Sequence, residues 1–251
     1  MKAKSPQELH ASMRGISKAD VSKTDIDIGV SRVEITEQAD GFTLTAKQDI
    51  DDGDIVLVER SDVFHTLTIK EMNTPASDAC FLVCKILKDP KMRVKYDEFG
   101  LDTSLVIKYE PSQVDKKYLI KLGEKTGTSF EEVLKLWQVV CAHYVLASSR
   151  WKVRTQLSKY INRINHSCYP NSEIKSLKLS KNDFTRRLIS LRAVQSIQKG
   201  DKITFCYMPP SLVSISNVAQ RREILKTEYK FVCECDRCVE EALDVGKSNN
   251  I

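Results

Sequence analysis

Apolar and polar residues alternate in the first part of the chain in a way that is typical of β-strands. Residues 42–46 read Phe-Thr-Leu-Thr-Ala, and residues 54–59 form an apolar, β-branched run after the turn Asp51-Asp52-Gly53. Three more β-type segments follow in the second half, at residues 172–179, 185–194 and 202–207. Residues 1–30 have no aromatic side chain and little apolar periodicity, so we expect a flexible N-terminal arm.

Helices are predicted between and after these β-rich segments. Thr74-Pro75 fits an N-cap with proline at the first helical position, and this helix ends near Asp89-Pro90. A second helix is predicted to begin at Thr128, where Glu131 completes a capping box. A third covers residues 216–228. Long helices that interrupt two β-rich segments indicate an α+β fold rather than a series of βαβ units.

Two short segments of the chain resemble each other. Gln48-x-Ile50-x-x-Gly53-Asp54-Ile55 and Gln195-x-Ile197-x-x-Gly200-Asp201-x-Ile203 both place a glycine turn before a β-branched strand. Two matches do not make a repeat array. They predict two similarly built corners within one sheet system.

Composition limits the class of protein. The 251 residues are 41% hydrophobic and 29% charged, which allows a buried core and argues against wholesale disorder. The chain has no apolar run of about 18 residues, so no membrane span is expected. The N-terminus has no apolar segment of a secretory signal, and we therefore expect a nuclear or cytoplasmic protein whose eight cysteines are thiols or metal ligands.

Positive charge is concentrated in one segment. Residues 133–199 contain thirteen lysines and arginines and two acids, a net charge of +11. One interpretation is a solvated basic face. The other is a surface that binds nucleic acid or an acidic stretch of a protein.

The strongest chemical signal is a group of cysteines near the C-terminus. Cys233, Cys235 and Cys238 lie within six residues, too closely spaced for core positions. Structural zinc takes four ligands and favours thiolates, so zinc is expected over a redox or loose thiol cluster. Spacing alone leaves the fourth ligand open among five other cysteines and four histidines. Cys168 stands out because it follows the polar stretch Asn165-His166-Ser167. Three others lie on apolar helical stripes and are interpreted as core residues: Cys80, Cys84 and Cys141.

Two further features are candidates for a site. Residues 165–171 read Asn-His-Ser-Cys-Tyr-Pro-Asn, a dense group of hydrogen-bonding side chains between apolar flanks. Tyr207 lies at the end of a predicted strand, where side chains reach into clefts, although a tyrosine there is more often a packing residue.

Taken together, these segments resemble the SET-domain lysine methyltransferases, in particular the SET and MYND type. Four motifs occur in the family's order, at Gly41–Glu59, Asn165–Asn171, Leu191–Tyr207 and Arg221–Cys238. The resemblance implies the SET β-clip fold, in which several short β-sheets and a knot-like C-terminal crossing accompany a helical insert and a zinc-binding post-SET segment. The implied parts are an arm (1–30), the N-terminal SET part (31–74), the insert (75–150), the C-terminal SET part (151–210) and the post-SET segment with its tail (211–251).

The resemblance also implies an activity and a set of site residues. The activity is transfer of a methyl group from S-adenosylmethionine to a lysine amine of a histone or non-histone protein, with Tyr207 as the catalytic residue. The implied cofactor contacts are Gly41, Phe42, Asn165, His166, Tyr207 and Phe231. The implied zinc ligands are Cys168, Cys233, Cys235 and Cys238. The implied substrate channel contains Phe205, Tyr207 and Tyr229. Phenylalanine at 205, where the family varies between Phe and Tyr, favours more than one methyl per lysine.

Two departures from the family pattern keep alternatives open. Thr43 replaces the second glycine of the family's Gly-x-Gly, which predicts weak or altered cofactor binding. No MYND cysteine pattern occurs between Glu59 and Thr74. The main alternative is a catalytically weak or inactive SET-like module that holds an acidic or nucleic-acid partner through the basic segment 133–199. A monomer without membrane association is expected in either case.

Overall fold

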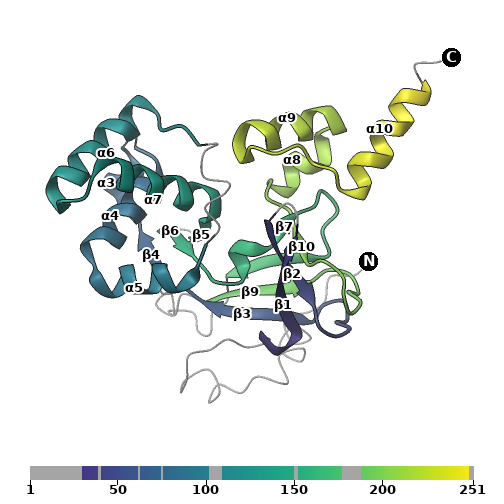
Figure 1. The fold of residues 1–251 in the computed structure, drawn as a ribbon. Helices are drawn as coiled ribbons and strands as arrows, with labels where there is room; N and C mark the ends of the chain where they lie inside the picture. Colours follow the sequence, from purple (N-terminus) through teal and green to yellow (C-terminus); the bar gives the residue numbers. More distant parts are fainter. Residues whose placement is uncertain are drawn as a thin grey trace.

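Small sheets, a helical insert and a C-terminal group of helices make up the fold (Figure 1). The computed structural model describes residues 30–38, 41–61, 63–74, 76–101, 109–149, 152–176 and 188–248. The predicted N-terminal arm therefore lies outside the described residues, except for Val30. Among the described helices, none has both the length and the apolar character that a membrane span requires.

The β-structure is divided among four sheets within the described residues. They are β1 (Val33–Gln38) with β2 (Gly41–Ala46), β3 (Ile55–Arg60) with β9 (Leu188–Ala193) and β8 (Ser172–Ser176), β4 (Val63–Thr66) with β6 (Lys152–Leu157) and β5 (Val145–Ser149), and the parallel pair β7 (Asn165–His166) and β10 (Thr204–Phe205). A short 3-10 turn, η1 (Val30–Arg32), precedes β1. Leu44, Leu57 and Leu191 are fully buried in a shared core. Within the described residues, the strands predicted in the second half are confirmed, although β10 is shorter than expected. Residues 177–179 and 185–187 of two predicted strands lie outside the described residues.

The two similar segments of the sequence lie against each other. Ile50 and Ile197 exchange backbone hydrogen bonds of 2.8 and 2.9 Å. Gly53 and Gly200 each donate an N–H across this pairing, at 3.0 and 2.7 Å, and their φ angles are 86° and 92°, where glycine is favoured. The prediction of two similarly built corners is confirmed, and the structure shows that the corners pair with one another.

The insert consists of helices packed around one core. They are α4 (Asp78–Lys88), α5 (Pro90–Phe99), α6 (Gln113–Thr126) and α7 (Phe130–His143), and the short helix α3 (Ile69–Met72) precedes them. Their core includes Trp137 and extends to Leu157 of β6. Cys80 lies in this core, and Cys84 and Cys141 pack against it, which confirms their interpretation as core residues.

The start of α4 differs from the prediction. Its N-cap is Ser77 rather than Thr74. Thr74 is not available for this role because its hydroxyl donates to the Glu71 carbonyl at 2.9 Å, at the end of α3. The predicted end of the helix is confirmed, since Asp89 is the C-cap of α4 and caps α5 in turn.

The start of α7 is displaced by one residue. Ser129 is the N-cap, and its capping box is completed by Glu132 instead of the predicted pair Thr128 and Glu131. The Thr128 hydroxyl is hydrogen-bonded to that of Thr126 at 3.1 Å. Thr128 with Glu131 and Ser129 with Glu132 both satisfy the capping pattern. The contact of Thr128 with Thr126 in the preceding turn leaves Ser129 as the cap.

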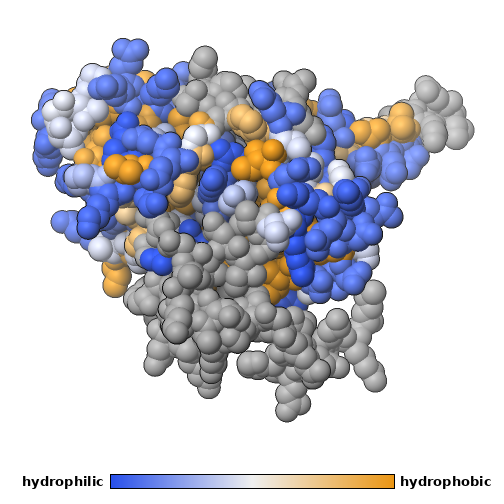
Figure 2. All heavy atoms as spheres, turned by 60° about the horizontal axis from the view of Figure 1, so that its bottom comes forward, coloured by the Kyte–Doolittle hydropathy of each residue, from blue (hydrophilic) through white to orange (hydrophobic). Residues whose placement is uncertain are grey.

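A C-terminal group of helices follows β10. It contains α8 (Pro210–Ile215), α9 (Val218–Tyr229) and α10 (Asp236–Ser248). The predicted helix at 216–228 is α9, whose N-cap Asn217 accepts a hydrogen bond from the Gln220 N–H at 2.9 Å. Figure 1 shows that α10 extends away from the rest of the molecule, and Figure 2 shows apolar side chains on its surface. Val239 and Leu243 are 42% and 61% exposed.

Asp115 connects α4 and α6 through a buried carboxylate. The residue is 5% exposed, and its Oδ1 accepts hydrogen bonds from the Ser77 N–H at 2.7 Å and the Cys80 thiol at 3.2 Å. Its Oδ2 accepts from the Ser112 hydroxyl at 3.0 Å. Burial acts to raise the pKa of Asp115, but these hydrogen bonds outweigh it and hold the pKa below its ordinary value.

We expect Asp115→Asn to lower the free energy of unfolding by about 1–3 kcal/mol, because an amide donor replaces a buried acceptor. A carboxylate with a depressed folded-state pKa stabilises the protein above its unfolded-state pKa of about 3.9. That stabilisation is lost as the pH falls through the folded-state value. Thermal unfolding of both forms from neutral pH down through the acid range checks whether the difference between them shrinks as the carboxylate is protonated.

The matched control is Asp97→Asn on α5. The Asp97 carboxylate forms an exposed ion pair with Arg93 at 3.2 Å, and its removal is expected to cost less than about 0.5 kcal/mol. Equal losses in the two variants would contradict a special role for the buried carboxylate.

Candidate active site and metal centre

The polar segment found in the sequence lies beside the end of β10. The parallel pairing of β7 with β10 places Asn165 opposite Thr204 and His166 opposite Phe205. The Asn171 side-chain oxygen accepts a hydrogen bond from the Thr204 N–H at 2.8 Å and so holds the far end of the segment. The two candidate features of the sequence therefore form one site.

His166 is connected to both the tyrosine and the cysteine group. Its Nδ1 accepts a hydrogen bond from the Tyr207 N–H at 3.0 Å. In the neutral ring the proton is then on Nε2, which lies 3.2 Å from the Cys168 Sγ. Burial lowers the pKa of His166 to about 4, with Cys235 acting in the opposite direction and Arg221 adding to the decrease. The imidazole is therefore uncharged at neutral pH.

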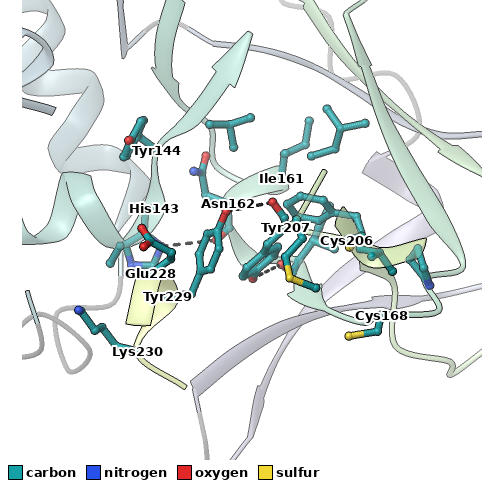
Figure 3. Close-up of a pocket in the computed structure, with 18 of the residues that line it drawn as sticks. His143, Tyr144, Ile161, Asn162, Cys168, Cys206, Tyr207, Glu228, Tyr229 and Lys230 are labelled. Carbon is teal, nitrogen blue, oxygen red and sulfur yellow. Dashed lines mark hydrogen bonds between the residues drawn. The ribbon is translucent and has the colours of Figure 1, made fainter. Parts of the chain in front are cut away.

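The Tyr207 hydroxyl is held by the backbone next to the polar segment. It donates to the Ile164 carbonyl at 2.8 Å, and the Tyr229 hydroxyl donates to the Tyr207 carbonyl at 3.0 Å (Figure 3). Burial raises the pKa of Tyr207, and the nearby phenols of Tyr109 and Tyr229 contribute. The hydroxyl thus stays protonated with its hydrogen committed to a carbonyl, which leaves its oxygen to act as an acceptor.

Tyr207 is the centre of an aromatic cluster. Its ring centroid lies 4.9 Å from that of Phe205 and 5.2 Å from that of Tyr229. On another side it lies 5.2 Å from the His166 ring and 6.1 Å from that of Phe231. Side chains from β7, β10 and the C-terminal helices therefore meet at this tyrosine. The electron-rich ring faces favour a bound cation.

A cavity of about 1210 Å³ opens on one side of Tyr207, between the insert, the strands and the C-terminal helices. Phe205, Tyr207 and Tyr229 line it, as the predicted channel requires. The insert contributes Tyr109 and Tyr144, which sequence reasoning missed. Tyr144 follows the apolar stripe of α7, which by itself predicts a core position, and no local pattern marks either residue as part of a site.

Of the predicted cofactor residues, only Tyr207 is among the described residues that line this cavity. Asn165, His166 and Phe231 are not among the described residues that line it, although the last two contact the Tyr207 ring. Tyr207 thus contacts this group and also lines the cavity.

Residues 41–43 of β2 form neither part of the cavity lining nor part of the aromatic cluster among the described residues. The Phe42 side chain is 37% exposed, and the Arg163 guanidinium lies 5.8 Å from the centre of its ring. Thr43 is fully buried, and its hydroxyl has no hydrogen-bond partner in the described part of the chain. The cofactor contacts of Gly41 and Phe42 remain predictions.

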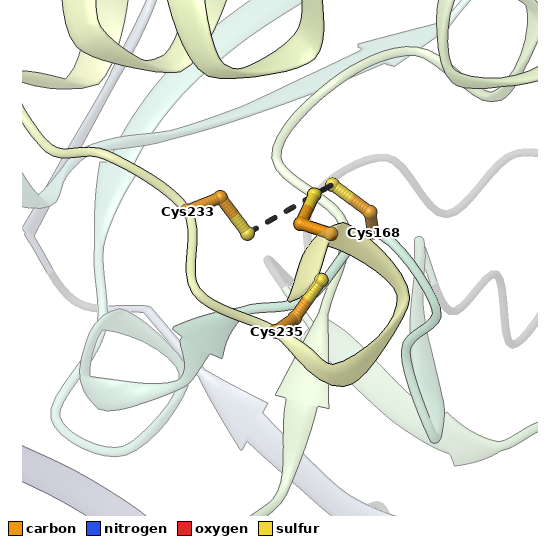
Figure 4. Close-up of side chains that lie close together, drawn as sticks. Cys168, Cys233 and Cys235 are labelled. Carbon is orange, nitrogen blue, oxygen red and sulfur yellow. Dashed lines mark hydrogen bonds between the residues drawn. The ribbon is translucent and has the colours of Figure 1, made fainter. Parts of the chain in front are cut away.

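Four thiols converge at the second part of the site. The sulfur atoms of Cys168, Cys233, Cys235 and Cys238 lie within 4.8 Å of one another, and the first three point toward one another in Figure 4. Cys168 Sγ is 3.9 Å from Cys233 Sγ and 3.6 Å from Cys238 Sγ. Tetrahedral zinc with Zn–S bonds of about 2.3 Å requires sulfur separations of about 3.8 Å. The donor set and the spacing therefore fit zinc. The fold brings together the four ligands that the resemblance implies.

Several basic side chains of the segment 133–199 are buried or bound to the backbone rather than free at the surface. Arg154 is 6% exposed, Arg163 donates to two backbone carbonyls at the end of α5, and Arg192 donates to the Gly53 carbonyl at 2.9 Å. Several other basic positions lie outside the described residues: Arg150, Lys178, Lys181, Arg186 and Arg187. Nucleic-acid binding remains a prediction.

Known proteins similar to this chain share its central part. Residues 41–208 match the SET domain family. Protein-lysine N-methyltransferase SMYD4 of Mus musculus is 33% identical over 100 residues, which are 39% of this chain and 11% of that protein. Histone-lysine N-methyltransferase SMYD3 of Homo sapiens is 31% identical over 102 residues, 40% of this chain and 21% of that protein. The chain thus matches a tenth to a fifth of the length of these relatives.

A solved structure has a similar fold. The SET domain of LSMT, determined with lysine and AdoHcy bound, has a TM-score of 0.54 and 15% identity, and the match covers 97% of this chain and 64% of that one. This likeness concerns the fold, and it agrees with the predicted α+β arrangement of short sheets, helical insert and C-terminal cysteine segment. Because the family match spans β2 to β10, including the paired β7 and β10 that build the site, we conclude that the chain belongs to the SET-domain family.

Proposed function

We propose that this chain transfers a methyl group from S-adenosylmethionine to the side-chain amine of a lysine in a protein. The observation that carries the proposal is that Tyr207 contacts the rings of His166 and Phe231, the proposed donor side, and also lines the aromatic cavity, the proposed lysine side. A methyl donor on the first side and a lysine in the cavity would meet at this residue. The relatives named as protein-lysine methyltransferases support this assignment.

The residues on the first side of Tyr207 fit S-adenosylmethionine, which supplies an electrophilic methyl group when bound. β7 belongs to a two-stranded sheet, so within the described residues one edge of its backbone is left to hydrogen-bond a planar base. The uncharged His166 does not repel a sulfonium, and the rings of Phe231 and Tyr207 attract a cation. Asn165 would hold the adenosine end, and Gly41 and Phe42 of β2 would complete the contacts.

The residues on the cavity side would prepare the lysine. A free lysine has a pKa of about 10.4, and an aromatic cavity disfavours its ammonium form. Tyr207 does not act as the base, because its raised pKa keeps it protonated and its hydrogen is donated to the Ile164 carbonyl. Its oxygen instead accepts an N–H of the amine and directs the nitrogen lone pair. Tyr207 is therefore the proposed catalytic residue, and its contribution is mainly positional.

Phe205 would influence how many methyl groups are added. Its ring lies 4.9 Å from that of Tyr207 in the same cavity and carries no hydroxyl. The space and the missing hydrogen bond allow a methylated amine to turn and react again. We therefore propose that the chain adds more than one methyl group per lysine.

Zinc at Cys168, Cys233, Cys235 and Cys238 would fix the C-terminal wall of the site. Three of these ligands follow Tyr229 and Phe231 closely in the sequence, while Cys168 belongs to the polar segment. A metal bound to all four ties the two segments together. We also propose that the protein is a monomer and acts in the nucleus or the cytoplasm.

A second candidate function is a SET-like binding module without catalysis. Thr43 favours it, because its buried hydroxyl has no partner among the described residues and the residue stands where the family carries glycine. A polar atom without a partner is costly inside a protein. Such a module would use its basic segment to hold an acidic or nucleic-acid partner.

Calorimetric titration with S-adenosylmethionine, with zinc measured on the same sample, distinguishes the two functions. We expect binding by the wild type and tighter binding by Thr43→Gly, since the change removes bulk at the predicted cofactor side. Mass spectrometry of candidate proteins incubated with the donor then detects lysine methylation. A zinc-loaded, folded protein in which neither form binds the donor would exclude the enzyme and leave the binding module.

A further inference from the structure

A fully buried arginine lies next to the four-cysteine group. Arg221 of α9 has 0% exposure, and its Nη1 donates to the Ser216 carbonyl at 2.7 Å. Its Nη2 donates to Glu241 Oε2 at 2.8 Å and lies 3.5 Å from Cys238 Sγ. One buried N–H, at Nε, has no partner among the described residues. Burying a charge in this way is costly unless other charges compensate it.

The cysteine group supplies more negative charge than Glu241 alone. Four thiolates around one divalent zinc ion carry a net charge of −2. Arg237 is the second cation nearby: its Nε donates to Glu241 Oε1 at 2.7 Å, and its Nη1 donates to the Cys168 carbonyl at 3.4 Å. Glu241 thus orients both guanidinium groups, and only Arg221 reaches a sulfur atom directly.

The contacts of Arg221 also connect the elements around the metal. Ser216 precedes α9, Cys238 is a proposed ligand, and Glu241 lies one turn further along α10. The guanidinium therefore touches the chain before and after the cysteine segment. Its placement is determined by the folded arrangement of α8, α9 and α10 and is not evident from sequence spacing.

We propose that Arg221 is a positioning residue for the metal centre, which strengthens zinc binding by compensating the negative charge of the four thiolates. The partners of metal ligands commonly change metal affinity by about 10–100-fold when they are removed. This role goes beyond methyl transfer and does not depend on it, since the metal itself is the readout.

The test compares Arg221→Met, which removes the charge at similar volume, with Arg221→Lys, which keeps it. Zinc affinity of the full-length chain is measured by competition with a chelator at fixed pH and salt. We expect Arg221→Met to bind zinc about 10–100-fold more weakly and Arg221→Lys to recover most of the loss. Cobalt-loaded samples should keep the thiolate-to-metal absorption of a tetrahedral four-sulfur site in all forms.

Arg222→Met is the matched control. Arg222 is the next residue on α9, and its Nε donates to the Cys233 carbonyl at 3.0 Å rather than to a sulfur atom. We expect it to bind zinc nearly as tightly as the wild type. Wild-type affinity in Arg221→Met, or an equal loss in Arg222→Met, would overturn the proposal.

If Arg221→Met does not fold, the zinc affinity of Glu241→Gln provides a second test. The change removes a negative charge from a side chain that is 35% exposed and preserves its shape. If Arg221 acts by charge compensation, zinc affinity should be unchanged or higher. The Glu241 carboxylate then no longer competes with the thiolates for the two guanidinium groups. A tenfold fall in affinity would show instead that the network acts through geometry alone.

Discussion

Replacement of Tyr207 by phenylalanine is expected to reduce methyl transfer by about 100-fold, because the amine loses the oxygen that orients it. The ring remains, so its contacts with Phe205, Tyr229 and Phe231 persist. Loss of the hydrogen bond to the Ile164 carbonyl should cost about 1 kcal/mol of stability. Methyl transfer to a lysine-containing peptide or protein substrate and the zinc content are measured on the same preparation.

The matched control is Tyr118→Phe in the insert. The Tyr118 ring packs edge-on against Phe81 at 5.6 Å, within the helical core and outside the site. We expect its activity to be close to that of the wild type. Full activity in Tyr207→Phe would remove the catalytic assignment, and equal losses in both variants would point to a general effect on folding.

Replacement of Cys235 by serine is expected to release the metal. Loss of a contact to a metal ligand lowers metal affinity by up to about 100-fold. Removal of a ligand itself should lower zinc affinity further. Because the metal ties the C-terminal segment to Cys168, its loss should displace Tyr229 and Phe231 and abolish donor binding. Zinc analysis, calorimetry and limited proteolysis of the α9–α10 segment measure these three effects.

Cys84→Ser serves as the control for this change. Cys84 is a half-buried cysteine that packs against the core of the insert. It should keep its zinc and bind the donor like the wild type. A Cys235→Ser protein that retains one zinc ion per chain would rule out the proposed ligand set.

Local patterns in the sequence identify several parts of this protein. Three cysteines within six residues predict a metal site, since thiols so close in the chain have few other common uses. The polar segment at 165–171 and the strand before Tyr207 mark the site, and family resemblance connects them. The two glycine corners are also visible, because φ angles near 90° require glycine at Gly53 and Gly200.

Local competition for hydrogen bonds limits the accuracy of the predicted helix starts. Thr128 and Ser129 both fit a capping box, and the choice depends on the contact of Thr128 with Thr126 in the preceding turn. The same holds for Thr74, whose hydroxyl serves the end of α3. Sequence patterns rank such residues equally, because each alternative satisfies the same local rule.

Contacts between distant segments are decided only by the tertiary structure. Spacing leaves the fourth metal ligand open, whereas the fold places Cys168 within 3.9 Å of Cys233. The fold likewise brings Tyr109 and Tyr144 of the insert to the cavity and Arg221 to the cysteine group. The sequence by itself thus determined which residues carry the chemistry, since residue type and local spacing define it. Tertiary structure alone decided which of them meet, because burial and pairing across the chain set their positions.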